Sequence, residues 1–327
     1  MNAVITGSNG FIGSSLVENL LAEGADVRCL VRSKPRSEAS DKAKRYIIDY
    51  ASEESIINSG ALNNADIIFH VAGVTKHLTL EGFRKGNVMP TQTLLEAAKK
   101  QAPYLKRFVL ISSQAAAGPA QHLEQPITEQ TSPKPIEEYG LSKLEAENLL
   151  RNGDHPFSYT IIRPPAVYGP RDVDFLPLFK QIGAGRGIYP GNKHSYISLI
   201  HVQDLVDGIL RAATSPSAEN QTYFLTNEET ITWQQVYQTI SKVLGKSIWE
   251  LNIPLPLIAF AARLGDLYSK LTGTISILNS KKIELAKPKL WICTSDKAKQ
   301  EFNFTPTIPM TEGMATTFEW YKKQGWV

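Results

Sequence analysis

The chain has 327 residues, of which 42% are hydrophobic and 20% are charged, an ordinary composition for a globular protein. This length suits one large α/β unit with a smaller unit appended to it. The formal net charge of +3 is small and acidic residues are interspersed among the basic ones, so nucleic acid is not expected as a partner.

The chain enters a predicted strand at residue 3, which leaves no room for a signal peptide. The longest apolar run without a charge, Leu251–Ala262, contains two prolines and is shorter than the ~18–20 residues of a membrane-spanning helix. We therefore expect a cytoplasmic protein and do not expect a membrane partner. The stretch Leu255–Ala262 could line an apolar pocket or, as the lesser alternative, dip into a membrane surface.

Strand and helix patterns alternate through the first half of the chain, starting with a strand at Ala3–Thr6 and a helix at Phe11–Leu21. Further strands are predicted at Asp26–Val31, Arg45–Ile48, Ala65–Val71, Arg107–Ile111 and Tyr159–Ile162, and further helices at Thr91–Lys100 and Glu137–Leu150. This alternation predicts an α/β fold with a doubly wound parallel sheet of the Rossmann type. Ligands bind such sheets beyond the carboxyl ends of the strands.

The pattern is less regular beyond Pro165. Helices are predicted at Val202–Ala213, Thr232–Leu244, Pro256–Leu271 and Met310–Lys323, and a strand at Gln221–Leu225. We interpret residues 1–165 as a dinucleotide-binding Rossmann domain and residues 166–327 mainly as a smaller substrate-binding lid domain. Later elements, such as those within 200–226, are expected to be interleaved with the Rossmann sheet.

A glycine-rich turn joins the first strand to the first helix with the spacing G-x-x-G-x-x-G. Glycines at such a turn allow a tight bend, close approach of the backbone to a pyrophosphate, and close packing of helix on strand. The helix N-terminus that opens there offers unpaired N–H groups to phosphate oxygens. We expect the turn to bind a dinucleotide through Gly7, Asn9, Gly10, Phe11, Ile12 and Gly13.

The second strand ends without the carboxylate that usually holds the ribose 2′-OH of NAD. Arg32 and Lys34 follow this strand instead and could pair with a 2′-phosphate, so NADP is the preferred cofactor and NAD is possible. The alternative is that both are solvated loop charges. Four more cofactor contacts are expected after the third and fourth strands, with the Asp49 carboxylate accepting from the adenine amine: Asp49, Tyr50, Ala72 and Gly73.

Tyr139 and Lys143 are four residues apart on a predicted helix and therefore share one face. An ammonium there is expected to lower the pKa of the tyrosine from ~10, so that the tyrosine can exchange a proton with a substrate hydroxyl. Ser113, just beyond the fifth strand, is placed to hold the same substrate oxygen. The six histidines show no metal-ligand spacing, and no metal site is predicted.

Four motifs together resemble the extended short-chain dehydrogenase/reductase family, closest to its NAD-dependent epimerase/dehydratase branch. They are Thr6-Gly7-x-x-Gly10-Phe11-Ile12-Gly13, Ser112-Ser113, Tyr139-Gly-Leu-Ser-Lys143 and Arg163-Pro164-x-x-x-Tyr168-Gly169-Pro170. The resemblance covers essentially the whole chain. The segment from Ser112 to Pro119 is more similar to 3β-hydroxysteroid dehydrogenases and dihydroflavonol reductases than to sugar epimerases.

The resemblance implies roles for the motif residues. Tyr139 would be the acid/base, Lys143 would hold the nicotinamide ribose, and Ser113 would position the substrate. Asn87 resembles the asparagine that this family places beside its active site, and Arg163 is expected among the cofactor contacts. Two departures matter: Gln114-Ala115 stands where sugar dehydratases carry Asp-Glu, and the second strand lacks the acidic residue that sugar epimerases usually keep.

These observations predict an NAD(P)-dependent oxidoreductase that transfers a hydride between nicotinamide and a secondary alcohol or ketone, its partner being a small-molecule substrate. The first alternative is an NAD-dependent nucleotide-sugar epimerase. The second is a non-catalytic NADP-sensing module, against which the intact Tyr139/Lys143 pair argues. The family also implies a possible homodimer, formed through the helix that bears Tyr139 and the helix before it.

Overall fold

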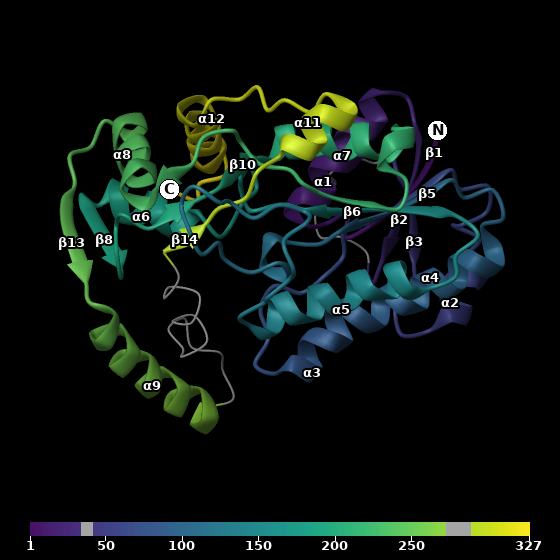
Figure 1. Ribbon diagram of the computed structural model, residues 1–327, viewed down its shortest axis with the longest axis horizontal. Coiled ribbons are helices and arrows are strands. Elements are labelled where there is room, and N and C mark those ends of the chain that lie inside the picture. Colours follow the sequence, from purple (N-terminus) through teal and green to yellow (C-terminus); the bar gives the residue numbers. More distant parts are fainter. Residues whose placement is uncertain (34–41, 273–288) are drawn as a thin grey trace.

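A seven-stranded sheet forms the centre of the computed structural model, which describes residues 1–33, 42–272 and 289–327 (Figure 1). The strand order is β11-β6-β5-β4-β1-β2-β3, and every neighbouring pair is parallel. The strands are β1 (Asn2–Thr6), β2 (Asp26–Val31), β3 (Lys44–Ile47), β4 (Ile67–His70), β5 (Arg107–Ile111), β6 (Ser158–Arg163) and β11 (Gln221–Phe224). The predicted doubly wound Rossmann sheet is thus confirmed.

The strand register brings the carboxyl ends of the central strands to one edge. Thr6 at the end of β1 lies opposite Leu30 of β2 and His70 of β4, and His70 lies opposite Leu110 of β5. The strand order reverses between β1 and β4, because β2 and β3 lie on one side of β1 while β4, β5 and β6 lie on the other. A reversal of this kind opens the crevice in which such sheets bind ligands.

Helices cover both faces of the sheet (Figure 1). One face carries α1 (Phe11–Ala22), α7 (Val202–Thr214) and α11 (Asp296–Phe302), and the other carries α2 (Glu53–Asn58), α3 (Leu80–Phe83), α4 (Met89–Gln101) and α5 (Glu138–Asn152). Each layer encloses its own apolar core. Because both faces are covered, β4 and β5 are buried along their whole length, as their almost uninterrupted apolar sequences require.

The second half of the chain builds a separate apolar core around Tyr168, Phe179 and Tyr321. Its strands form small sheets of two or three: β7 (Ala166–Tyr168) with β10 (Leu199–His201), β8 (Arg186–Pro190) with β13 (Trp249–Ile253), and β9 (Tyr196–Ile197) between β12 (Ile231–Thr232) and β14 (Leu290–Trp291). Its helices are α6 (Leu176–Gly183), α8 (Trp233–Leu244), α9 (Leu255–Thr272) and α12 (Met310–Lys323). The domain boundary at residue 165 stays a prediction.

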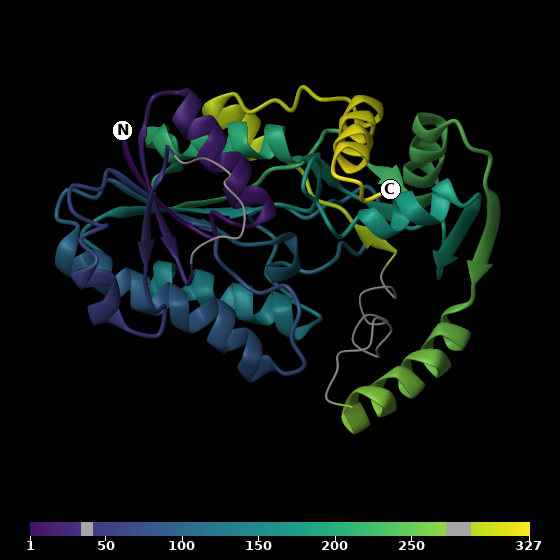
Figure 2. The same ribbon diagram turned by 180° about the vertical axis from the view of Figure 1, so that it is seen from behind.

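Local signals set the ends of several of these elements. A capping box between Thr232 and Gln235 starts α8, and Gly245, with φ of 62°, ends it in the left-handed region. The helix α9 leaves β13 and extends away from the rest of the molecule (Figures 1 and 2). No helix among the described residues is long and apolar enough to span a membrane.

Candidate active site

The turn between β1 and α1 has no room for side chains at its glycines. A Cβ atom on Gly7, whose φ is 73°, would lie 2.6 Å from the amide nitrogen of Ala72. A Cβ atom on Gly13 would lie 2.1 Å from the carbonyl oxygen of Gly7. Gly10 precedes the first helical residue and offers no side chain to cap the helix. The first N–H groups of α1 therefore face a bare backbone turn at the carboxyl edge, as pyrophosphate binding requires.

A chain of hydrogen bonds beneath the turn fixes its shape. The imidazole of His70 lies with Nδ1 2.7 Å from the Thr6 hydroxyl and Nε2 2.9 Å from the Thr91 hydroxyl. The Thr6 oxygen also accepts from the Ala72 amide at 3.0 Å, which joins the ends of β1 and β4. Burial lowers the pKa of His70 to about 3, assisted by the charge of Lys143, so this histidine is neutral and structural.

Lys143 lies on α5, one turn after Tyr139, and is buried. Its ammonium donates to the carbonyl oxygen of Ile111, the last residue of β5, at 2.6 Å. Burial lowers the pKa of Lys143 to about 8, and the carboxylate of Glu147 one turn further along α5 opposes that shift. The lysine is therefore attached to the sheet at the edge where a ligand binds.

Tyr139 is half-buried, and burial raises the pKa of its hydroxyl to about 12. A hydrogen bond with the Ser113 side chain opposes this rise, whereas the negative charges of Glu137 and Asp174 add to it. We expected Lys143 to lower this pKa. That expectation is wrong for the chain without ligand. The loss of hydration raises the pKa of Tyr139 by more than the Ser113 side chain lowers it, and the Lys143 ammonium donates to a backbone carbonyl.

Ser113 begins the short 3₁₀ turn Gln114–Ala116, and its hydroxyl accepts from the Ala115 amide at 3.1 Å. The same side chain lies close enough to the Tyr139 hydroxyl to act on its pKa, so Ser113 and Tyr139 converge although they come from different elements. Two hydroxyls that already meet can hold one substrate oxygen between them. Ser113, Tyr139 and Lys143 are thus the predicted residues that the structure brings together.

Asn87 is buried within a π-helical turn (Arg84–Val88) that precedes α4. Its amide oxygen accepts from the Val74 amide at 2.7 Å, and its amide nitrogen donates to the Ser142 hydroxyl at 2.9 Å. Ser142 in turn donates to the carbonyl of Tyr139 at 2.7 Å. Asn87 therefore connects the loop after β4 to the helix that carries the tyrosine and the lysine.

Arg163 has its charge paired inside the protein. Its guanidinium donates to both oxygens of Glu147, at 2.9 and 2.6 Å, and the Ser112 hydroxyl donates to the same carboxylate at 2.5 Å. Burial acts to raise the pKa of Glu147, but the bonds from Arg163 prevail and hold it below its usual range. The network connects α5 to β5 and β6, and it leaves the Arg163 guanidinium occupied by a carboxylate.

The other expected cofactor residues lie along the same edge. Gly73 passes close to Asn87 and Lys143, since a Cβ atom there would be 2.9 Å from the Asn87 oxygen and 3.6 Å from the Lys143 ammonium. Arg32 and Asp49 are exposed after β2 and β3, and the Tyr50 hydroxyl donates to the Leu30 carbonyl at 2.8 Å. Lys34 lies outside the described residues.

Sequence reasoning missed two groups beside Tyr139. The ring of Phe83 lies 6.0 Å from the tyrosine ring, and Asp174 is close enough to affect its pKa. Asp174 pairs with Lys76 at 2.7 Å, which joins the loop after β4 to the loop before α6. No motif surrounds either residue, so only the folded chain reveals that these loops meet.

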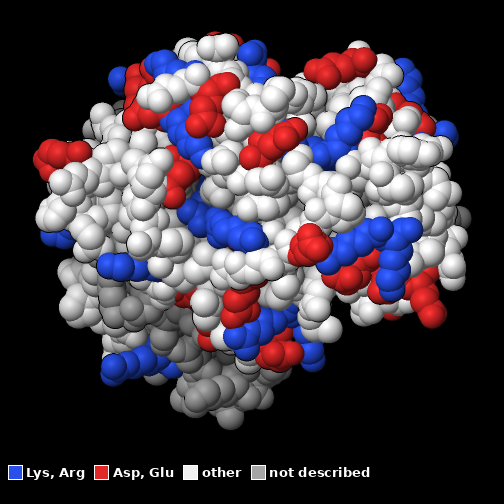
Figure 3. Space-filling view, turned by 45° about the vertical axis from the view of Figure 1, so that its right-hand side comes forward, with Lys and Arg blue, Asp and Glu red and all other residues white. Residues whose placement is uncertain are grey.

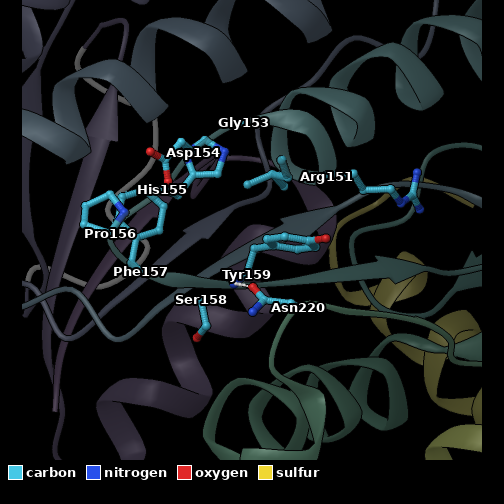
Figure 4. A pocket seen from close by; sticks show the side chains of 10 residues that line it. Arg151, Gly153, Asp154, His155, Pro156, Phe157, Ser158, Tyr159 and Asn220 are labelled. Atoms are coloured by element: carbon cyan, nitrogen blue, oxygen red, sulfur yellow. Dashed lines mark hydrogen bonds between the residues drawn. The ribbon is translucent and has the colours of Figure 1, made fainter.

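A hollow of about 460 Å³ lies elsewhere, at the amino end of β6 and the last turn of α5 (Figure 4). His155, Phe157, Tyr159 and Asn220 are among its lining residues, and the Asn220 side chain accepts from the Tyr159 amide at 3.1 Å. None of the expected site residues lines it. The hollow is therefore distinct from the carboxyl edge of the sheet, where the expected site residues lie.

Charged side chains of both signs are interspersed on the face shown in Figure 3. Among the described residues, no group of three or more histidine, cysteine, aspartate or glutamate side chains could hold a metal ion. The fit of a nicotinamide dinucleotide rests instead on the glycine turn, because a Cβ atom at Gly7 or Gly13 would collide with backbone atoms and distort the turn that a pyrophosphate approaches.

Comparison with known proteins also indicates a nicotinamide-dependent enzyme. The model of the NAD dependent epimerase/dehydratase family matches residues 3–225. A ceramide reductase of Caulobacter vibrioides is 28% identical over 326 residues, which cover 99% of this chain and 95% of that protein. A 4-hydroxy-2-methyl-3-oxo-4-farnesyl-3,4-dihydroquinoline-1-oxide ketoreductase of Stigmatella aurantiaca is 27% identical, over 96% of this chain and 95% of its own length.

Among solved structures, the UDP-glucose 4-epimerase of Thermotoga maritima superposes with a TM-score of 0.79 at 22% identity, over 99% of each chain. The chain therefore belongs to the NAD-dependent epimerase/dehydratase family, within the extended short-chain dehydrogenases/reductases. The resemblance drawn from the four motifs is confirmed. Like the other members of this family, the protein is a nicotinamide-dependent enzyme.

Proposed function

We propose that the protein is a reductase or dehydrogenase that interconverts a ketone and a secondary alcohol, with Tyr139 as the acid/base. The observation that carries this proposal is the meeting of Ser113 and Tyr139, from two different elements, beside the buried Lys143 at the carboxyl edge. When bound, a nicotinamide dinucleotide supplies or accepts the hydride.

The residues of the chain handle the proton. A ketone oxygen that accepts from both Ser113 and Tyr139 is fixed in position, and Tyr139 donates its proton to that oxygen as the carbonyl carbon is reduced. A phenolate then remains in a partly buried site. In this proposal Lys143, which has a pKa of about 8 and so is largely charged at neutral pH, has to turn part of its hydrogen bonding from the Ile111 carbonyl towards the bound ligands in order to stabilise that phenolate. The high pKa of Tyr139 keeps the tyrosine protonated until a substrate arrives.

Reduction is favoured over epimerisation or dehydration by two features. Gln114 and Ala115 stand where a dehydratase needs an acid and a base, and the side chain of Gln114 is buried. The two reductases described above match nearly the full chain, and their names describe substrates with apolar parts, a ceramide and a farnesylated dihydroquinoline oxide. We propose a ketone with a long apolar chain as the substrate class.

A Tyr139→Phe variant tests the chemistry. It removes the proton donor and retains the ring, so we expect turnover with a panel of aliphatic ketones to fall by about a hundredfold or more, while cofactor binding persists. Turnover is followed as loss of NADPH absorbance, and binding by fluorescence titration. Undiminished turnover would overturn the assignment. Epimerisation of UDP-sugars by purified protein that retains its NAD, with no net consumption of cofactor, would favour the epimerase alternative.

The preference for NADP over NAD is a second proposal, supported by Arg32 at the end of β2 and by the missing carboxylate there. An Arg32→Ala variant should weaken NADPH binding by about tenfold and leave NADH binding nearly unchanged, because only NADPH carries the 2′-phosphate. Lys44→Ala, at an exposed position on β3, is the matched control. Equal binding of both cofactors by the unmodified protein would contradict the preference. Homodimerisation through α5 and the helix before it stays a prediction.

A further inference from the structure

The segment 249–263, which we call the apolar arm, consists of β13 and the first half of α9 and contains exposed apolar side chains on both elements. In β13, Trp249 and Leu251 are 65% and 38% exposed; they are two residues apart and so point to the same side of the strand. In α9, Leu257 and Phe260 are 62% and 66% exposed and lie one turn apart. Four large apolar side chains thus meet solvent within 12 residues.

The helical part of the apolar arm is hydrophobic on more than one side. Ile258 and Ala262 are buried and pack with Ile253, whereas Leu257 and Phe260 face outward. A surface helix of a water-soluble domain normally places polar side chains on its outer face. Apolar side chains that gather on an outer face mark a site of contact with another apolar phase.

The charges of the apolar arm and of the residues just before it in the sequence are mostly positive, and the next carboxylate, Asp266, lies further along α9. Between residues 242 and 263 the sequence contains Lys242, Lys246 and Arg263 but only one carboxylate, Glu250. That carboxylate is bonded to Lys193 at 2.6 Å. Lys242, Lys246 and Arg263 form no ion pair with any carboxylate that the structure describes, and all three are exposed. Lys242 and Lys246 thus precede β13, which carries the exposed tryptophan, and Arg263 follows the exposed phenylalanine on α9, so each end of the apolar arm has at least one cation that complements a negatively charged surface.

We propose that the apolar arm docks on the surface of an anionic phospholipid bilayer. Aromatic and aliphatic side chains would enter the boundary between headgroups and acyl chains, and the three cations would contact the anionic headgroups. No described helix is able to cross the bilayer, so the contact is interfacial. This attachment does not depend on the redox chemistry at Tyr139, and the two can fail separately.

The test is co-flotation of the full chain with vesicles of phosphatidylcholine that contain about a quarter of phosphatidylglycerol. We expect binding to these vesicles, weaker binding at high salt, and at least a tenfold loss of affinity in the double variant Leu257→Ser/Phe260→Ser. Tyr104→Ser, which removes another highly exposed aromatic side chain far from the arm in sequence, is the matched control and should bind as the unmodified chain does. The reduction of a water-soluble ketone should be the same in all three proteins.

Several outcomes would overturn the proposal. Absence of binding to anionic vesicles is one, and equal binding by the double variant is another. Sedimentation that shows a dimer held by the apolar arm, and broken by the double variant, would assign the surface to a second copy of the chain instead. A double variant that has lost its activity on the soluble ketone has misfolded, and Lys242→Glu/Lys246→Glu then decides: unchanged vesicle binding by that variant rejects the role of the cations and the proposal with it.

Discussion

The layer around Lys143, at the carboxyl edge of the sheet, and the core of the second half are both buried, but their polar side chains differ in hydrogen bonding. Around Lys143, the side chains of His70, Asn87 and Glu147 are all held by directed hydrogen bonds. In the second core, the hydroxyls of Tyr168 and Tyr321 are buried without a hydrogen-bond partner among the described residues. That core is built from ring contacts instead, such as Phe179 against Tyr321 at 5.2 Å.

The difference teaches what each region contributes. A network of directed hydrogen bonds admits few arrangements, and this one fixes α5, which carries Tyr139 and Lys143, the residues proposed to act in proton transfer. The second core is stabilised mainly by buried apolar area and ring contacts, which leave its tyrosine hydroxyls without a bonded partner among the described residues. Three variants and a pH series test this contrast, from the largest expected effect to the smallest.

Removal of the Glu147 carboxylate should lower the free energy of unfolding more than any other change. Glu147→Ala leaves the buried guanidinium of Arg163 without its counter-charge, so we expect the free energy of unfolding to fall by about 3–5 kcal/mol. Urea denaturation measures it. Glu319→Ala, which breaks an exposed pair with Lys322, is the control and should cost less than about 1 kcal/mol. Similar losses in the two variants would mean that the network does not distinguish the first region.

The two regions should also respond to acid with opposite signs. His70 has a pKa of about 3 in the folded chain and 6.5 when unfolded, so the unfolded chain holds more protons between these values. Stability from His70 is present above pH 6.5 and is lost as the pH falls towards 3, by up to about 1.4 kcal/mol per pH unit. Asp172 is buried in the second half, and burial raises its pKa from 3.8 to about 6. Stability from Asp172 is present below pH 3.8 and is lost as the pH rises through 6.

Asp172→Asn isolates this opposing contribution. In the unmodified chain, Oδ1 of Asp172 accepts from the Asp174 amide at 2.8 Å and Oδ2 accepts from the Phe175 amide at 2.9 Å. The single amide oxygen of asparagine retains one of these two bonds and does not titrate, so the variant loses a hydrogen bond at every pH and lacks the pH dependence of Asp172. Between pH 6 and pH 4 the variant should lose stability more steeply than the unmodified chain, as measured by urea denaturation across the series. Asp154→Asn, at an exposed position, provides the reference. Parallel curves for Asp172→Asn and the unmodified chain would contradict the sign.

The smallest effect is expected where a buried hydroxyl has no partner. Tyr168→Phe should change the free energy of unfolding by less than about 0.5 kcal/mol, or stabilise the chain, because no hydrogen bond within the described structure is lost. Tyr223→Phe is the matched comparison, since its equally buried hydroxyl lies within hydrogen-bond distance of the Glu301 carboxylate and of the Ser217 carbonyl and donates its one hydrogen there. That variant should lower the free energy of unfolding by about 1.5–3 kcal/mol, the range for a hydrogen bond to a charged group. A larger loss of stability in Tyr168→Phe than in Tyr223→Phe would contradict the contrast between the two regions.

The sequence predicted the first region well because its signals are local. The glycine turn, the apolar strands and the four-residue spacing of Tyr139 and Lys143 each lie within one element, and the structure shows each where it was expected. The boundaries moved by one to a few residues, as in β4, which is Ile67–His70 rather than Ala65–Val71.

The remaining features depend on contacts between distant parts of the chain. Glu147 and Arg163 meet only when α5 packs on β6, and the small sheets of the second half pair short strands that carry little pattern of their own. The direction of the Tyr139 pKa was missed for the same reason, because the burial that raises it comes from the fold around the residue. The sequence alone likewise did not decide the role of the outward face of α9, because its apolar residues could line a pocket as well as lie on a surface.

The hydrogen-bond chain through His70 also fixes which ring nitrogen carries the proton. The one hydrogen of the Thr91 hydroxyl goes to the Asn87 carbonyl at 2.6 Å, so Thr91 must accept from His70, and the ring is the Nε2–H tautomer. Such a proton, shielded from water, exchanges slowly and gives a resolved signal in a nuclear magnetic resonance spectrum. His70 therefore serves as a built-in spectroscopic reporter on the turn between β1 and α1.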